Sequence, residues 1–314
     1  MQFSSSHLAI PFILALALLS GCSGGGSSSS APAISSQAPP PPQPSGTPAV
    51  ATSFEEQAVM RGLSFGFGFS TSMNEMVRLF AGGAASGDVD GDGDIDLFIV
   101  RGDLGPNLLY INEGGMSFRE AAGAAGLAYT KDASTNYRHS GPTFADLNGD
   151  GNLDLFIGGL ENDPSLIFLN DGTGTFTDVT TGSGIDRMDS IHTISAAFGD
   201  YDRDGDLDIA MAHWGTPRNS VLPGETETLW RNDSDASGLK FVAVSGPAGI
   251  SAELKLDSAQ GVLGTDHDYT FAPSFADIND DGYPDLLSVA DFGGSRIFIN
   301  QQDGTFERAT YTPD

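Results

Sequence analysis

Four aspartate-rich segments of the chain share one spacing of oxygen-bearing side chains. Each segment has Asp or Asn at its first, third, fifth and ninth positions and Gly at its sixth. A calcium ion takes six to eight oxygen ligands at about 2.3 to 2.6 Å, and a tight loop of alternating carboxylates supplies them, with a backbone carbonyl at the seventh position. Gly permits the sharp bend such a loop requires. The segments, called ladders below, span 88–96, 146–154, 200–208 and 277–285.

The ladders predict about four bound calcium ions. Turn formation alone would explain one Asp- and Gly-rich loop, but not four with the same spacing. An EF-hand needs an acidic twelfth position, where this chain has Ile99, Ile157, Met211 and Ser288. The candidate ligands are Asp88, Asp90, Asp92, Asp94, Asp96, Asp146, Asn148, Asp150, Asn152, Asp154, Asp200, Asp202, Asp204, Asp206, Asp208, Asp277, Asn279, Asp281, Tyr283 and Asp285.

The net charge of the chain limits the classes of partner that it can bind. In 314 residues, 42 acidic side chains stand against 14 basic ones, a formal net charge of -28. Such a surface repels nucleic-acid phosphates, so we exclude nucleic acid as a partner. Carboxylates clustered in this way are instead suited to binding hard cations.

The sequence around each ladder predicts an antiparallel β unit. Strand A precedes the ladder, strand B is the apolar stretch after it, strand C ends at an Asn and strand D begins at a Phe. Short strands separated by Gly and Asn turns are typical of antiparallel sheets, and four strands per repeat favour the blades of a β-propeller. The ladders begin 58, 54 and 77 residues apart. The closing residues of C are Asn112, Asn170, Asn232 and Asn300, and those opening D are Phe118, Phe176, Phe241 and Phe306.

The repeats resemble the FG-GAP and VCBS family, which includes the integrin alpha-chain propeller and bacterial surface proteins with runs such as FGDYDRDGDLDI, found here at 198–209. The resemblance covers about residues 54–310. It implies an all-β propeller of antiparallel four-stranded blades, with Ca²⁺ held in the A-to-B hairpin by Asp88, Asp90, Asp92 and Asp96 and by their equivalents in the other repeats.

The number of blades departs from that family, whose propellers commonly have seven. Only four ladders are present, although residues 54–63 (FEEQAVMRGL) repeat the pattern of strand D without a ladder. That stretch is either a strand that completes a ring of four or five blades or a remnant of a longer array. An incomplete ring would favour self-association.

The N-terminal region predicts export and anchoring. Residues 8–19 form an apolar run that is too short to cross a bilayer but suits a signal peptide. Leu19-Ser20-Gly21-Cys22 resembles a bacterial lipobox, which implies a lipid on Cys22, the only cysteine in the chain. We therefore expect a lipoprotein-type signal peptide at 1–22, a Ser-, Gly- and Pro-rich tether at 23–52 and the repeat domain at 53–314. The expected location is the outer membrane or cell surface, with secretion or the periplasm as alternatives.

The end of each blade opposite the ladder carries the longer loops and a second group of candidate residues. Trp214 and Arg218 lie in an insertion of the third repeat, where they could stack on a sugar or a protein side chain; the alternative for Trp214 is ordinary packing within the loop. The histidines could bind a transition metal or simply form hydrogen bonds within loops. Trp230 aligns with core aromatic positions of the other repeats and is predicted to be buried. The histidines are His139, His192, His213 and His267.

The residues favour binding over catalysis. The sequence holds no recognisable nucleophile motif, catalytic histidine pattern or phosphate loop, so we assign no catalytic residue. The leading hypothesis is a cell-surface, calcium-binding protein that adheres to an extracellular glycan or protein. The alternatives are a polysaccharide-processing enzyme, since some lyases resemble such a propeller, and a structural fragment that assembles with another chain.

Overall fold

The computed structural model describes residues 55–69, 78–187, 192–217, 228–256, 267–291 and 295–310. The chain divides into two units, Met1–Phe54 and Glu55–Asp314, and every described residue belongs to the second. The predicted signal peptide, Cys22, the tether and Arg218 lie outside the described residues. Within the described ranges, no helix has both the length and the apolar composition needed to cross a membrane.

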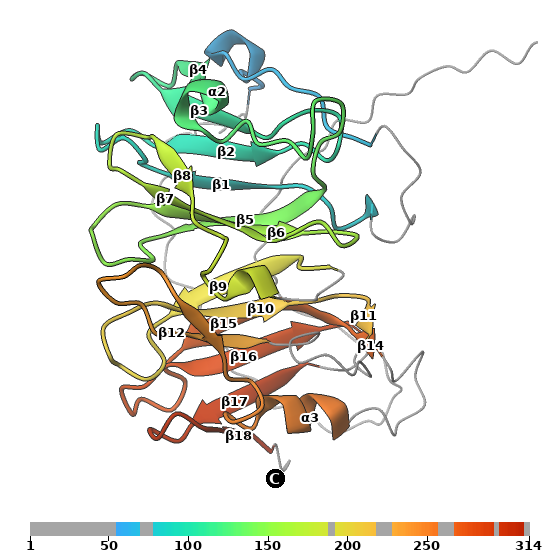
Figure 1. Ribbon diagram of the computed structural model, residues 1–314, viewed down its shortest axis with the longest axis vertical. Coiled ribbons are helices and arrows are strands. Elements are labelled where there is room, and N and C mark those ends of the chain that lie inside the picture. Colours follow the sequence, from blue (N-terminus) through green and yellow to red (C-terminus); the bar gives the residue numbers. More distant parts are fainter. Residues whose placement is uncertain are drawn as a thin grey trace, which may run out of the picture. The chain divides into compact units, whose positions relative to one another are not determined.

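The described residues form four antiparallel four-stranded sheets, one for each ladder (Figure 1). Every ladder lies between the first and second strands of its sheet, as the sequence predicts. A two-stranded ribbon of β11 (Thr216–Pro217) and β14 (His267–Asp268) accompanies them. Sheet I comprises β1 (Gly83–Gly87), β2 (Asp96–Val100), β3 (Leu108–Asn112) and β4 (Phe118–Glu120); sheet II comprises β5 (His139–Ala145), β6 (Asp154–Gly159), β7 (Leu166–Asn170) and β8 (Phe176–Asp178); sheet III comprises β9 (Ser195–Gly199), β10 (Asp208–Ala212), β12 (Leu229–Asn232) and β13 (Phe241–Ala243); sheet IV comprises β15 (Thr270–Ala276), β16 (Asp285–Ala290), β17 (Arg296–Asn300) and β18 (Phe306–Arg308).

Strand register follows from the repeat. In all four sheets the Asn that closes the third strand lies directly opposite the Phe that opens the fourth, as Asn112 does with Phe118. The second strands are apolar on both faces, because each middle sheet packs between two neighbours; all six residues of β6 are buried. The prediction of an all-β fold of four-stranded antiparallel units is therefore confirmed.

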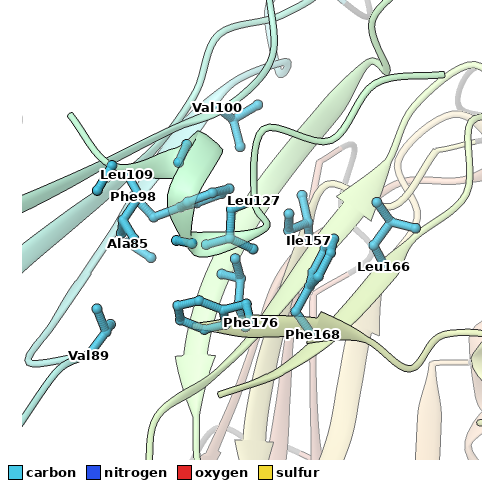
Figure 2. Close-up of a cluster of buried hydrophobic side chains, with 14 of the residues drawn as sticks. Ala85, Val89, Phe98, Val100, Leu109, Leu127, Ile157, Leu166, Phe168 and Phe176 are labelled. Carbon is cyan, nitrogen blue, oxygen red and sulfur yellow. The ribbon is translucent and has the colours of Figure 1, made fainter. Parts of the chain in front are cut away.

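The sheets pack on one another in sequence order (Figure 1). The first strand of each sheet contacts the first strand of the next, β1 on β5, β5 on β9 and β9 on β15, while no comparably extensive contact joins β15 to β1. An apolar cluster lies between each adjacent pair of sheets. Between sheets I and II it includes Phe98, Leu109, Leu127 and Phe168 (Figure 2). Trp230 lies in the cluster between sheets II and III, so the prediction that it is buried is confirmed.

A short helical turn follows the fourth strand of sheets I to III and packs on the fourth strand of the next sheet. These turns are α2 (Ala122–Ala125), η2 (Ile185–Arg187) and α3 (Ile250–Leu256). The approach requires glycine: a Cβ on Gly126, whose φ is +80°, would lie 2.6 Å from the carbonyl oxygen of Phe176. Gly184 and Gly249 approach the carbonyl oxygens of Phe241 and Phe306 in the same way. We call each such turn, with its Gly, a wedge.

Residues 55–63 correct the expectation of a fifth strand D. They form η1 (Val59–Arg61) and a turn, and no residue of 55–63 is in a strand. A Cβ on Gly62 would lie 2.2 Å from the carbonyl oxygen of Phe118, so this segment sits on sheet I as a wedge does. The sequence match to strand D is therefore a match to the wedge that follows a fourth strand.

Candidate calcium sites

The first aspartate of each ladder shapes its loop. The carboxylate of Asp88 accepts the backbone N–H groups of Asp92 and Gly93, which are the fifth and sixth positions. The same two bonds form in the other three ladders, and all eight measure 2.8 to 3.2 Å. Aspartate side chains are suited to such local bonds to the backbone. The ladder is thus a turn held by its own carboxylate.

The fifth position fixes the end of the loop. Its carboxylate accepts the backbone N–H of the seventh position in all four ladders, at 2.8 to 3.0 Å. One oxygen of the fifth side chain is therefore oriented by the chain itself. The residues at the seventh position, Asp94, Asn152, Asp206 and Tyr283, are half-buried.

The ninth position also has a structural role, as a hydrogen-bond acceptor, that the sequence did not predict. Asp208 is fully buried, and its two oxygens accept the backbone N–H of Tyr201 at 3.0 Å and of Asn232 at 2.9 Å. It therefore ties the second position of the ladder to the end of the third strand. Asp96, Asp154 and Asp285 make the same pair of bonds. The signal in the sequence was the constant pairing of a ninth-position Asp with a closing Asn in every repeat.

Burial perturbs these ninth-position carboxylates. Loss of solvent raises the pKa of Asp96, and it raises the pKa of Asp154 to about 6 and that of Asp208 to about 7, against the opposing effect of the two backbone N–H donors. Neighbouring ladder aspartates also raise these pKa values by charge repulsion. A nearby cation would favour the ionised form of all three groups.

Two ladders bring three carboxylates within reach of one ion. Oxygens of Asp88, Asp90 and Asp96 lie within 4.8 Å of one another, and so do those of Asp200, Asp202 and Asp208. Oδ1 of Asp202 is buried and has no hydrogen-bond partner among the described residues. A buried carboxylate oxygen that accepts no hydrogen bond is available to coordinate a cation. The residues of these ladders therefore fit a calcium ion.

The other two ladders carry one negative charge fewer at the third position. There Asn148 and Asn279 replace Asp, and each amide nitrogen donates to the fifth-position carboxylate, Asp150 at 3.0 Å and Asp281 at 2.9 Å. Each amide oxygen remains a neutral ligand for a cation. The ladders therefore fall into two classes by charge, the first and third against the second and fourth.

The histidines lie apart from one another, and three of them have polar contacts of their own. His139 Nδ1 lies 3.2 Å from Asn107 Nδ2, His192 Nδ1 accepts the backbone N–H of Glu161 at 3.1 Å, and His213 Nδ1 lies 3.2 Å from Thr193 Oγ1. All three side chains are buried. His267 begins β14, where its backbone pairs with Pro217. Among the described residues, the groups able to hold a metal contain aspartates alone, and none includes a histidine.

Burial of His139 predicts a loss of stability in acid. Desolvation lowers its pKa to about 4, below the ordinary value of about 6.5. The unfolded chain therefore binds a proton that the folded chain excludes between those values, and stability falls as the pH drops through this window. We expect the stability difference between the wild type and His139→Gln to shrink by about 3 kcal/mol between pH 7 and pH 4, measured by urea denaturation. A difference that does not change with pH would contradict this assignment.

Trp214 is a core residue, which corrects the expectation of an exposed stacking surface. Its side chain is 7% exposed. The ring lies 4.3 Å from that of Phe80 and 5.6 Å from that of Tyr269, and Nε1 donates to Asp291 at 2.9 Å. The aromatic partners come from before the first ladder and after the third, so sequence position in a loop gave no sign of burial.

Removing this ring is expected to destabilise the protein. We expect Trp214→Ala to lower the free energy of unfolding by about 3 to 5 kcal/mol, because a large buried aromatic group is lost and a cavity remains. Leu79→Ala, at a side chain that is 73% exposed, is the matched control and should change stability by about 0.5 kcal/mol or less. Equal denaturation midpoints for the two variants would show that Trp214 does not support the core.

The fold and the ladders together define a class of protein: a tandem array of four-stranded antiparallel sheets, each with an aspartate loop, two of which bring three carboxylates within reach of one cation. The FG-GAP-like repeat matches residues 88–157 and 146–211. Residues 88–211 are therefore FG-GAP-like repeats, and the resemblance seen in the sequence is confirmed over this part of the chain.

Curated relatives match part of the chain. Mouse cartilage acidic protein 1 (Mus musculus) is 31% identical over 160 residues, which is 47% of this chain and 23% of the relative. The human protein (Homo sapiens) is 30% identical over 164 residues, again with 23% of its length covered. The chain thus spans less than a quarter of the relatives it matches.

Two solved structures share a distant likeness. A lectin of Agrocybe aegerita, solved for its recognition of non-reducing terminal N-acetylglucosamine, has a TM-score of 0.44 and 20% identity over 76% of this chain and 54% of its own. The V. cholerae biofilm matrix protein Bap1 has a TM-score of 0.33 and 18% identity over 76% of this chain and 32% of its own. At TM-scores below 0.5 these likenesses support no inference about a ligand.

Proposed function

We propose that this chain is a cell-surface, calcium-binding repeat protein whose ordered sheets bind an extracellular glycan or protein. The observation that carries the proposal is the common framework of the four ladders, in which the same carboxylate positions are oriented by the same backbone bonds. The relationship to cartilage acidic proteins supports an extracellular location.

The sheets are proposed to be blades of a β-propeller, with their first strands innermost. Support comes from the contacts of β1 with β5, β5 with β9 and β9 with β15, since a central line of first strands is what a propeller requires. The ladders then lie together at one end of the blades, because each occupies the hairpin between the first and second strands.

Each ladder would hold one ion through the side chains of its first, third, fifth and ninth positions. Bound calcium would supply positive charge that compensates the repulsion among these carboxylates. Hydrogen bonds of the ladder residues hold the loop in shape: the first and fifth positions close the turn, and the ninth position joins the loop to the third strand. Calcium and strand pairing are thereby coupled.

The two charge classes predict two classes of affinity. We expect the first and third ladders to bind calcium about tenfold more tightly than the second and fourth, because ligand charge is one determinant of affinity at such sites. Asp90→Asn should weaken one tight site, and Asn148→Asp, which adds the missing carboxylate, should strengthen one weak site. Isothermal titration calorimetry of the two variants beside the wild type measures both shifts. Shifts in the same direction would contradict the assignment of the third position as a ligand.

The binding role is tested on the purified protein with a glycan array and a polysaccharide panel, each with calcium and with chelator. Calcium-dependent retention on a glycan without product formation supports the proposal, whereas an unsaturated sugar product would establish a lyase instead.

The proposed surface anchoring rests on Cys22 and is tested by cell fractionation. Cys22→Ser should leave the membrane fraction, and its retention there after alkaline washing would refute the anchor.

A further inference from the structure

The faces between successive sheets follow one rule of register. In sheet I, the residues two and four places after the ninth ladder position and those one and three places before the closing Asn are Phe98, Val100, Ile111 and Leu109, and all four are buried in the cluster with sheet II. Figure 2 labels Phe98, Val100 and Leu109 of this set. In sheets II and III, the residues two places after the ninth position and three before the Asn lie in the cluster with the next sheet: Phe156, Ile167, Ala210 and Leu229.

The same register positions of sheet IV are less buried in the part of the chain that the structure describes. They are Leu287, Val289, Ile299 and Ile297; Val289 is 47% and Ile297 38% exposed, and the other two are half-buried. Leu287, Val289 and Ile297 line a groove of about 1030 Å³. Ile278, at the second ladder position, is 43% exposed, although its counterparts Val89, Leu147 and Tyr201 are buried. Sheet IV therefore presents the surface that a following sheet would cover.

A hydrogen bond marks each internal interface. The side-chain amide of Asn170 donates to the carbonyl oxygen of Val89 in the preceding ladder at 2.8 Å. Asn232 and Asn300 donate in the same way to Leu147 at 3.0 Å and Tyr201 at 2.8 Å. Asn112 Nδ2 donates within its own repeat to the carbonyl oxygen of Ile95 at 3.3 Å, and no bond to another ladder is formed by it among the described residues. In this series the carbonyl of Ile278 and the amide nitrogen of Asn112 therefore have no counterpart on a neighbouring sheet.

Sheet I carries the complementary half of such an interface. The N-terminal wedge sits on it as α2 sits on sheet II, and Phe65 packs 6.4 Å from Tyr110 as Tyr129 packs 5.5 Å from Phe168. The wedge is less well covered than its counterpart, since Leu63 is only half-buried whereas Leu127 is fully buried.

We propose that sheet IV of one copy docks on sheet I and the N-terminal wedge of a second copy, head to tail. The contact would repeat the internal interface, with Asn112 of the second copy donating to the Ile278 carbonyl of the first. On sheet I itself Ile99 and Tyr110 are already buried, and the exposed apolar side chains lie in and beside the N-terminal wedge, such as Met60 at 73% and Phe65 at 48%. The occupant is a second copy because one chain carries an exposed sheet IV face and this partly covered wedge, which are the two sides of the internal interface. Such a heterologous contact closes into a ring if the rotation permits, and otherwise extends as a filament. The inference does not depend on bound calcium.

Cysteine pairing on the full chain tests this contact directly. Two differently tagged chains are co-expressed, one carrying Ile297→Cys and the other Leu63→Cys; their counterparts Leu109 and Leu127 share one core cluster (Figure 2). A short bismaleimide should link the two tags. The control pairs Ile297→Cys with Met116→Cys, in the exposed turn before β4, and Cys22 is present in every chain. Linkage no greater than in the control would overturn the proposal.

Sedimentation of the wild type and of Ile297→Lys gives a second readout. The wild type should sediment as a dimer or larger assembly, and the variant as a single chain with an unchanged melting temperature, because Ile297 lies on an uncovered face. A wild type that sediments as a single chain at micromolar concentration would refute the proposal, and would show that sheet IV is left open or covered within its own chain.

Discussion

Withdrawal of calcium is expected to lower the free energy of unfolding by about 5 kcal/mol. At a mean dissociation constant of about 0.1 mM, usual for extracellular sites, millimolar calcium contributes RT ln(1 + [L]/Kd), or about 1.4 kcal/mol per site on average. Four independent sites would approach the whole net stability of about 5 to 15 kcal/mol of an ordinary domain. Cys22 is the only cysteine, so a disulfide within the chain cannot replace the ions.

The measurement is a pair of thermal melts, one in millimolar calcium and one with excess chelator. A midpoint that falls by many degrees in chelator and recovers on adding calcium is the expected result. Asp204→Ala removes one ligand of the third ladder, and its loss of stability should be about one site's share, roughly 1.4 kcal/mol, larger in calcium than in chelator. An unchanged midpoint in chelator would show that the ladders stand without ions.

The second large effect is expected from the ninth ladder position. Asp208→Ala should destabilise the protein by about 3 to 5 kcal/mol even in chelator, because it leaves the buried N–H groups of Tyr201 and Asn232 without acceptors. Asp206→Ala, at a half-buried position of the same ladder, is the matched control and should cost less than about 1 kcal/mol in chelator. Urea denaturation of both variants in chelator separates this bond from any effect of calcium. Equal stabilities of the two would contradict the double role of the ninth residue.

The strands could be predicted from the sequence because the same pattern recurs in four repeats. A ladder, an apolar run, a closing Asn and an opening Phe recur together, and each marks a strand end that the structure confirms. The ninth-position bond was not foreseen, since its second donor, such as Asn232, follows Asp208 by 24 residues and meets it only when the third strand pairs.

Tertiary packing overrode two local interpretations. Trp214 was a candidate for ligand stacking because it lies in an inserted loop, but its ring packs against Phe80 and Tyr269, which lie far from it in sequence. Residues 54–63 match strand D and left a strand open as one of two interpretations, but the residue of that match that decides the structure is Gly62, whose positive φ suits a turn that approaches the backbone of Phe118. Neither neighbour can be inferred from local periodicity.

The central claim is that each ladder holds one calcium ion, and counting bound ions tests it most directly. Isothermal titration calorimetry of the calcium-free protein should give about four ions per chain in two affinity classes, reduced by one in Asp204→Ala. Fewer than two ions per chain, or a count that Asp204→Ala leaves unchanged, would contradict the account.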